Sequence, residues 1–467
     1  MKYTYLALLF VAFKACLVLA DSETIFCNST SQCPEEQPCC SQYGQCGTGF
    51  YCLGGCDPRY SFNLSACMPM PVMKEFNTSF TNISEIANIN DYLGNASETD
   101  WIYSGHIAGH NKDLMLQMPN GTTGSVISSS SYLWYGKVSA RLKTSRTNGV
   151  VTAFILFSDV QDEIDFECVG YNLTFPQSNY YSRGFLDYHN ANSSETSDTF
   201  ENYHLYELDW DQDRIEWSID GSVVRTLTKE STWNDTAKVF NYPQTPTRIQ
   251  MSLWPGGALS NGLGTIEWAG GAIDWNAADI QQYGYFYAYL DYVSYKAHDW
   301  PEGVKRVGSN NTKDLNAFVY NSSNGNQSNI MWVKAKTWIG SSDASGLNPD
   351  NEDEEVTTVI SSGSSKSTKT NTIPRKTSSG TNTNVPTMVT NGAPKATGGS
   401  NGSGNSGDSN TVAYNSEDGF VQNYKATSTG TNGGSSGSSS NEGSSLNLDW
   451  VIGMVSAMGV GVFSFLV

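Results

Sequence analysis

The chain has 467 residues, of which 38% are hydrophobic and 12% aromatic, so it can bury a large core. Its formal net charge of -19 at pH 7 would repel the phosphates of nucleic acids. We therefore expect no nucleic-acid partner.

Residues 1–20 have the pattern of a secretory signal peptide. Lys2 precedes the apolar run 6–13, and a cleavage site of small residues ends at Ala20. Cleavage there removes Cys16 and leaves nine cysteines in an oxidising compartment, where disulfides form. We expect a secreted protein, and sequons from Asn28 to Asn401 are typical of a glycoprotein.

Eight cysteines lie between Cys27 and Cys67, in about 40 residues with little apolar content. Such a small core needs cross-links, so we expect four disulfides, for which the sequence alone allows 105 pairings. The vicinal Cys39 and Cys40 and the stretch that follows them resemble the hevein-like chitin-binding module. That resemblance implies the pairs Cys27–Cys40, Cys33–Cys46, Cys39–Cys52 and Cys56–Cys67.

The same resemblance implies that Ser41, Tyr43 and Tyr51 grip N-acetylglucosamine. Gln45 occupies a position that is aromatic in such modules, so the module departs from the pattern there. The alternative is a folded cap that does not bind chitin.

His106 and His110 have the spacing of zinc ligands on a helix. Their neighbours lie before a strand-rich segment, and no third ligand is in view. We expect no metal and no cofactor.

Segment 162–167 places four acids within six positions of a strand-like run. On a strand, Glu163, Asp165 and Glu167 share one face, and apolar residues share the other. The Cα atoms of the two glutamates then lie about 13 Å apart, and side chains that lean together can close the gap to several Å. Cys168 lies on the apolar face, where we expect a buried free thiol.

A close pair of carboxyl groups is typical of glycosidases. Retaining enzymes need a separation of roughly 5 to 5.5 Å and inverting enzymes about 6.5 to 9.5 Å, and the sequence leaves both open. Crowded like charges raise the pKa of at least one carboxyl, as a general acid requires, and Asp165 can tune the pair. The alternative is a solvated acidic edge strand, although such edges more often carry Lys.

Other alternating runs indicate an all-β domain. Ile215, Trp217 and Ile219 alternate with polar residues and lead into Asp220-Gly221, which is a hairpin signal.

The run 248–254 places Arg248, Gln250, Ser252 and Trp254 on one face. We expect Arg248 to donate to sugar hydroxyls and Trp254 to stack on a pyranose, so that both line the cleft. A half-exposed sheet face is the alternative.

Three further residues near these runs are candidates for substrate contacts. Thr265 follows a Gly-rich turn at the same rim and offers a hydroxyl. Tyr132 and Trp134 either stack on sugar or fill the core.

From residue 341 the composition changes to Ser, Thr, Gly and Asn, which cannot bury a core. We expect a disordered, O-glycosylated stalk over 341–441, in which the acidic run 351–355 is a solvated linker. The apolar run 450–467 lacks a following positive charge and resembles a glycosylphosphatidylinositol (GPI) signal. Counting back over a polar spacer favours attachment at Asn441 and removal of 442–467, with a transmembrane helix as the alternative.

Segment 163–167, Glu-Ile-Asp-Phe-Glu, resembles the signature of glycoside hydrolase family 16. Segments 132–138 and 203–221 resemble blocks of that family in the same order. The resemblance implies a curved antiparallel β-sandwich of the jelly-roll type over residues 75–340, preceded by the disulfide-rich module at 27–67.

It also implies a retaining mechanism in which Glu163 is the nucleophile, Glu167 is the acid/base proton donor that contacts the substrate, and Asp165 assists them. In the order of its parts, the chain resembles the Crh family of fungal cell-wall enzymes, which transfer chitin chains onto β-glucan. The implied activity is transglycosylation, with weaker chitinase activity.

The implied partners are a chitin donor, a β-glucan acceptor, and the membrane and cell wall through the GPI anchor. The implied location is the cell wall and the outer face of the plasma membrane. The alternatives are a secreted β-1,3- or 1,3-1,4-glucanase and a non-catalytic chitin-binding wall protein.

Overall fold

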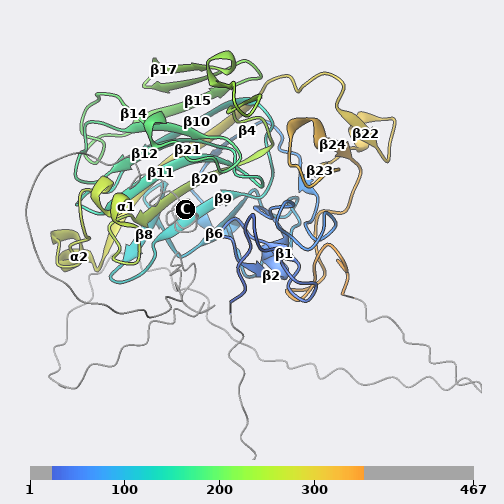
Figure 1. The fold of residues 1–467 in the computed structure, drawn as a ribbon. Helices are drawn as coiled ribbons and strands as arrows, with labels where there is room; N and C mark the ends of the chain where they lie inside the picture. The colour runs from blue at the N-terminus through green and yellow to red at the C-terminus, as the bar shows by residue number, and fades with distance from the viewer. Residues whose placement is uncertain (1–23, 352–467) are drawn as a thin grey trace, which may run out of the picture.

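The computed structural model describes residues 24–351 and is built almost entirely from strands. Two eight-stranded sheets are stacked into a β-sandwich, a small disulfide-rich module lies against one end, and the strands that follow the sandwich lie beside that module (Figure 1). The predicted all-β sandwich with a preceding disulfide-rich module is confirmed.

The first sheet, here called the β17 sheet, has the strand order β17-β16-β15-β10-β21-β8-β7, with β4 paired to β21. Its strands are β4 Phe76–Ser79, β7 His106–His110, β8 Asp113–Pro119, β10 Gly136–Lys143, β15 His204–Trp210, β16 Arg214–Ile219, β17 Ser222–Thr228 and β21 Tyr285–Ala297.

The second sheet, here called the β12 sheet, has the order β14-β13-β12-β11-β20-β9-β6-β5. Its strands are β5 Ala87–Asn88, β6 Trp101–Ser104, β9 Ser125–Ser129, β11 Val150–Ser158, β12 Glu163–Val169, β13 Gln177–Tyr181, β14 Asn192–Ser193 and β20 Thr247–Pro255.

Short elements complete the fold. The strands β1 Cys39–Cys40 and β2 Cys46–Gly47 pair, as do β18 Trp233–Asn234 and β19 Val239–Phe240. A four-stranded sheet comprises β3 Met70–Pro71, β22 Lys305–Val307, β23 Ala317–Tyr320 and β24 Ile330–Val333. The helices are α1 Leu263–Trp268, α2 Ala278–Tyr283 and the 3-10 turns Gly49–Cys52, Ile83–Glu85, Tyr188–Asn190, Lys229–Thr232, Thr312–Asp314 and Gln327–Asn329.

The core between the two large sheets follows from alternation along the strands. Ile164 and Phe166 of β12 point into it, and the ring of Phe166 meets Tyr206 edge-on at 5.1 Å. The predicted hairpin is present, because Asp220 and Gly221 have φ values of 51° and 78° and join β16 to β17. Cys168 is a buried free thiol as expected.

The four disulfides of the module join Cys27 to Cys40, Cys33 to Cys46, Cys39 to Cys52 and Cys56 to Cys67. These are the pairs that the hevein-like resemblance implies. Each bridge closes a short loop, so the module depends on cross-links more than on apolar contacts.

The first residues assigned to the stalk are packed against this module, which corrects the predicted boundary at 341. The backbone N–H of Gly49 donates to Ala344 at 2.8 Å, and Gly346 donates to Ala66 at 2.9 Å. Ile339 and Ala344 are buried in the apolar cluster of the module, so a few apolar residues suffice to hold this polar segment. The rest of the predicted stalk, the signal peptide and the GPI signal lie outside the described residues.

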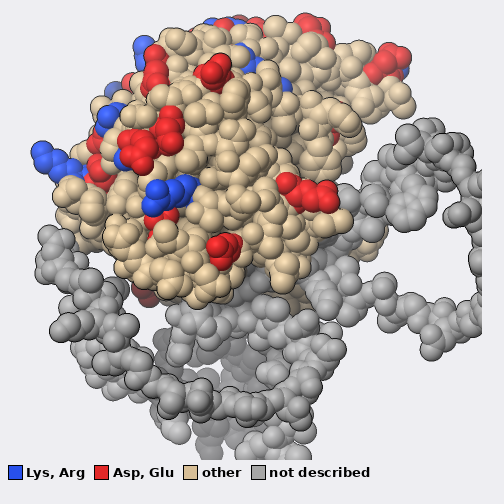
Figure 2. All heavy atoms as spheres, turned by 90° about the vertical axis from the view of Figure 1, so that its left-hand side faces the viewer, with Lys and Arg blue, Asp and Glu red and all other residues tan. Residues whose placement is uncertain are grey.

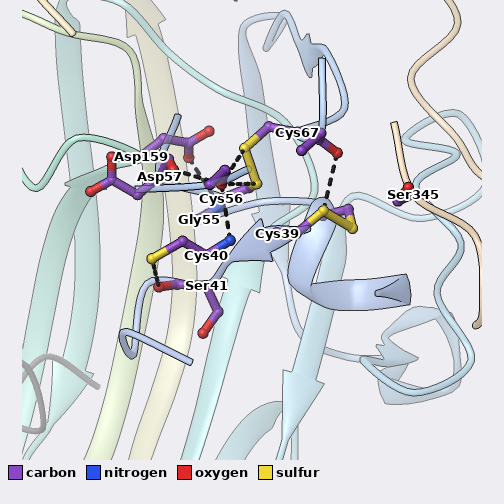
Figure 3. Close-up of a disulfide and its surroundings, with 12 residues drawn as sticks. Cys39, Cys40, Ser41, Gly55, Cys56, Asp57, Cys67, Asp159 and Ser345 are labelled. Carbon is purple, nitrogen blue, oxygen red and sulfur yellow. Dashed lines mark hydrogen bonds between the residues drawn. A yellow bond between two sulfur atoms is a disulfide. The ribbon is translucent and has the colours of Figure 1, made fainter. Parts of the chain in front are cut away.

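The module is joined to the sandwich by buried polar groups. The backbone N–H of Gly55 donates to Asp159 at 3.0 Å, beside the Cys56–Cys67 disulfide (Figure 3). Arg59 pairs with Asp57 through two nitrogens and also donates to Gln161 at 2.9 Å. Asp159 and Gln161 both lie in the loop between β11 and β12, so their contacts hold the module next to the β12 sheet.

On the face shown in Figure 2, the basic residues are few and stand among acidic ones. Within residues 24–351, no helix is long and apolar enough to cross a membrane.

Arg59 yields a test of module docking, because it pairs with Asp57 inside the module and also donates to Gln161 of the sandwich. The side chains of Arg59 and Asp57 are 9% and 1% exposed, so replacing Arg59 by Met strands a buried carboxylate. We expect the free energy of unfolding, measured in urea, to fall by about 3 kcal/mol.

The matched control is Lys238→Met, which breaks an exposed ion pair with Asp235. We expect it to change the free energy by less than about 1 kcal/mol. Equal effects of the two substitutions would contradict the docking role of Arg59.

Candidate active site

Strand β12 carries the three acids that the sequence singles out. Glu163, Asp165 and Glu167 point away from the core between the sheets, because Ile164 and Phe166 occupy the core-facing positions. We call this outward side of the β12 sheet the site face. Glu163 and Asp165 are 1% and 0% exposed, and Glu167 is partly buried.

The neighbouring strands surround the acids with neutral residues. Register places Phe157, Ile155 and Ala153 of β11 opposite Glu163, Asp165 and Glu167 in turn. On the other side, β13 offers tyrosine, asparagine and glutamine side chains at the matching positions, Tyr181, Asn179 and Gln177. Among the described residues, both carboxylate oxygens of Glu163 and Oε1 of Glu167 lack a hydrogen-bond partner. A ligand with hydroxyl groups could supply those donors.

Burial raises the pKa of each of the three acids. The pKa of Glu163 is raised well above its usual range by burial and then by the charges of Asp165 and Glu167. The pKa of Glu167 is also raised well above its usual range, by burial and by Asp165, while the nearby Trp254 N–H opposes the rise. Burial raises the pKa of Asp165 to about 7, against the charge of Arg225. A protonated and an ionised carboxyl can therefore coexist here near neutral pH.

The backbone under Asp165 is held by the other sheet. The indole N–H of Trp217, on β16, donates to the carbonyl of Asp165 at 2.9 Å. The guanidinium of Arg225 lies 4.6 Å from the Trp217 ring and donates to the carbonyl of Ser178 at 2.7 Å. Trp217 is fully buried, so this link crosses the core.

Asp162 has a structural role that the acidic pattern did not distinguish. Its Oδ2 accepts from the backbone N–H of Gln244 at 2.8 Å and from the hydroxyl of Thr245 at 2.7 Å. Its Oδ1 accepts from the backbone N–H of Arg183 at 2.9 Å. Asp162 thus ties the loop before β12 to two other loops and does not belong with the three acids on the site face.

Trp254 lies on the site face, where the sequence places it. Its ring stacks with Trp268 at 6.0 Å, and it is close enough to Glu167 to affect the pKa of that acid. Thr265 is partly buried on the short helix α1, three residues before Trp268.

Arg248 lies on the site face but contacts the small module. Its Nη2 donates to Oε1 of Gln42 at 2.8 Å, and its guanidinium lies 5.9 Å from the Tyr132 ring. The side chain is 4% exposed, so it is a link between module and sheet. A single alternating run could not reveal this role, because Gln42 lies far away in sequence.

Trp134 fills the core, which is the second of the two roles that the sequence left open, and not the substrate contact. It is 1% exposed and packs edge-on against Phe318 at 5.5 Å, and its indole N–H donates to the carbonyl of Gln244 at 2.9 Å. Strand β23, which carries Phe318, covers Trp134. No local sequence pattern indicates that these two segments lie together.

Tyr132 is also buried, and its hydroxyl donates to Asp159 at 2.5 Å. Burial raises the pKa of Asp159 to about 7. Asp159 is not among the site residues predicted from the sequence. Its position three residues before the acidic segment was the only available signal.

The residues proposed to grip N-acetylglucosamine are distributed over the module. Ser41 is buried and accepts from the backbone N–H of Gln45 at 3.3 Å. Tyr43 is partly buried and packs against Val126 of the β12 sheet. Tyr51 stacks on Phe50 at 4.4 Å. Ser41 and Tyr43 thus lie at the junction with the sandwich.

His106 and His110 lie at the two ends of β7 and not on a helix. Four residues of strand separate their Cα atoms by about 13 Å, too far for them to share a zinc ion. Within residues 24–351, the one group with metal-binding spacing is Cys27, Cys33 and Cys40, whose sulfurs are in disulfides.

Comparison with known proteins agrees with the chemistry of β12. Residues 95–270, which contain the three acids, match the family model described as glycosyl hydrolases family 16. The chain is 52% identical over 460 residues to "Crh-like protein UTR2" of Candida albicans, with 96% of each chain covered. It is 47% identical over 328 residues to "Congo red hypersensitive protein 2" of Saccharomyces cerevisiae, with 69% of each chain covered.

Among solved structures, the fold is similar to a "Crh5 transglycosylase in complex with NAG". The sequence identity is 26% and the TM-score is 0.47, and the match covers 59% of this chain and 99% of that one.

The raised pKa of Asp165 predicts how stability depends on pH. An unfolded Asp ionises near pH 4, whereas the folded Asp165 stays protonated up to about pH 7. The contribution of Asp165 to the free energy of unfolding is therefore complete below about pH 4 and is lost as the pH rises to about 7. The free energy of unfolding should therefore decline between about pH 4 and about pH 7. We expect this decline to be smaller in Asp165→Asn, by at least about 1 kcal/mol.

The measurement is urea unfolding at a series of pH values. The control is Glu201→Gln, which changes an exposed acid and should leave the decline as it is. Parallel pH profiles for the unsubstituted chain and Asp165→Asn would show that Asp165 does not carry the effect.

Proposed function

Since the chain belongs to the Crh-like proteins and carries a glycosyl hydrolase family 16 domain, we propose that it is a retaining transglycosylase that transfers chitin chains onto β-glucan. Its enzymatic action on polysaccharide is supported by the family. The observation that carries the proposal is the buried triplet on β12, whose alternation aims Glu163 and Glu167 into one site with Asp165 between them.

The first step forms a covalent intermediate. The carboxylate of Glu163 attacks the anomeric carbon of a donor sugar, and its oxygen forms an ester bond as the glycosidic bond breaks. Glu167, held protonated by its raised pKa, gives its proton to the departing glycosidic oxygen. Once Asp165 is ionised, at about pH 7 and above, its negative charge raises the pKa of Glu167 further and helps Glu167 to keep its proton.

The second step reverses the roles. Glu167, now ionised, takes the proton from a hydroxyl of the acceptor sugar, whose oxygen attacks the anomeric carbon and releases Glu163. With a sugar as acceptor, the product is a joined chain. With water, the product is a shortened chain, which accounts for a weaker chitinase activity. An acceptor held in place before water arrives favours transfer.

The proposed setting is the outer face of the fungal cell. The Crh-like relatives favour a cell-wall location. Secretion through a signal at residues 1–20 and a GPI anchor at Asn441 are further parts of the proposal, and they rest on the sequence patterns alone.

A transfer assay tests the function. The full chain is incubated with a chitin-derived donor and a fluorescent β-glucan oligosaccharide, and incorporation of fluorescence into longer products is measured. We expect incorporation by the unsubstituted chain and a loss of at least about a thousandfold in Glu163→Gln.

The assay also separates the alternatives. Shortened glucan without incorporation would indicate a hydrolase, and chitin retention without any turnover would indicate a binding protein. Full activity of Glu163→Gln would show that the nucleophile is misassigned.

The role of Glu167 has a signature of its own. A leaving group that departs without a proton, such as a nitrophenolate, does not need an acid. We expect Glu167→Gln to slow formation of the covalent intermediate by about a hundredfold or more with oligosaccharide donors, and far less with a nitrophenyl glycoside. Pre-steady-state release of nitrophenolate from the glycoside, and of the leaving sugar from the oligosaccharide donor, measures the step, and equal losses with both donors would argue against an acid role.

A further inference from the structure

An arginine of the β17 sheet contacts the β12 sheet close to the acidic strand. Arg225 lies on β17, opposite Trp217 of β16 in the strand register, and its side chain is partly buried. Its Nη1 donates to the carbonyl of Ser178 at 2.7 Å and to the hydroxyl of the same residue at 3.3 Å. Ser178 lies on β13, the strand that pairs with β12. Arg225 therefore joins the two sheets at the edge next to the three acids.

Two aromatic rings hold the guanidinium in place. Its central carbon lies 4.6 Å from the centre of the Trp217 ring and 5.5 Å from that of the Tyr180 ring. Such contacts stabilise a cation that is partly removed from water. Trp217 in turn donates its indole N–H to the backbone carbonyl of Asp165 at 2.9 Å. A continuous series of contacts thus leads from the cation to the position of Asp165 on β12.

The charge of Arg225 acts on one acid of the three. It opposes the rise that burial causes in the pKa of Asp165, whereas the pKa values of the two glutamates are raised by burial and by neighbouring acids. Two tyrosines also face these groups, Tyr181 beside the acids and Tyr180 beside Arg225, and burial raises the pKa of each. Both stay neutral near neutral pH, so the charges that matter are those of the three acids and of Arg225.

Two protonation patterns compete when Asp165 and Glu167 share a single proton. The proposed mechanism needs the pattern in which Glu167 holds it, because Glu167 protonates the leaving group. A positive charge that acts on Asp165 favours this pattern, since it stabilises the carboxylate of Asp165 and leaves the proton to Glu167. Without that charge, more of the proton resides on Asp165, and less Glu167 is in its acid form.

We propose that Arg225 is a positioning residue of the active site, which keeps the shared proton on Glu167 by stabilising the carboxylate of Asp165. The inference deepens the proposed function and rests on it for the role of Glu167. Arg225 contacts the core-facing Trp217, whereas the acids point to the site face. It therefore acts through Asp165 and not by contact with the substrate.

The pH profile of kcat/KM with oligosaccharide donors tests the proposal. In Arg225→Met the shared proton passes to Asp165, so Glu167 loses its acid form at lower pH. We expect the alkaline limb of the profile to move to lower pH, and kcat/KM at about pH 8, relative to its maximum, to fall about tenfold. Arg225→Lys keeps the positive charge and should restore most of the limb, although it lacks the planar fork.

The matched control is Arg306→Met, which removes an exposed arginine that lies 5.9 Å from the Trp332 ring, in the four-stranded sheet. It should leave the pH profile unchanged. In the Asp165→Asn background, Arg225→Met should no longer move the alkaline limb. A limb that stays in place in Arg225→Met, or that moves equally with and without Asp165, would overturn the proposal.

A stability measurement separates this inference from the proposed function. Urea unfolding of the unsubstituted chain, Arg225→Met, Asp165→Asn and the double variant gives the coupling between the two residues without any need for activity. The charge interaction exists only where the folded Asp165 is ionised, so the stabilising coupling appears as the pH rises through about 7. We expect it to change the unfolding equilibrium constant about tenfold more at about pH 9 than at about pH 5.

The two outcomes of this cycle are distinct. Coupling that grows with pH would support the link between Arg225 and Asp165 even in a chain that fails to transfer, and that failure would count against the proposed function alone. Coupling that is equal at both pH values would show that the contacts of Arg225 are purely structural, and it would overturn the inference.

Discussion

The burial of three carboxyl groups on one strand face is the constraint on which the rest of the structure depends. Glu163, Asp165 and Glu167 sit among neutral side chains, and Arg225 opposes the pKa rise of Asp165 alone. Removing such groups from water is unfavourable for folding unless they keep their protons. In the proposed mechanism, the same raised pKa values supply the general acid, so the proposal implies that stability is exchanged for reactivity at this strand.

The remainder of the sandwich holds these acids in place. The core-facing side of β12 is anchored by Ile164 and Phe166, and Trp217 reaches across the core to the carbonyl of Asp165. Asp162 joins the loop that precedes the strand to two other loops. A carboxyl pair works only if its spacing is kept, and these contacts come from both sheets and from loops on one side.

The small module and the segment after β24 are also packed onto the sandwich and onto each other. Asp159 and Arg248 bind the module through Gly55 and Gln42, and Ala344 is buried against the other side of the module. The β12 sheet, the disulfide-rich module and the first part of the predicted stalk therefore form a continuous packed unit.

The sequence by itself determined the face of Glu163, Asp165 and Glu167, the hairpin at Asp220 and the all-β class, because these follow from a side-chain period of two along a strand. The family resemblance supplied the disulfide pairs, which spacing alone left open. Only the tertiary structure decided that Trp134 fills the core, that Arg248 holds the module, and that the residues after 341 are packed. Each of these depends on contacts between segments distant in sequence, and a local pattern carries no information on which distant segment covers which face.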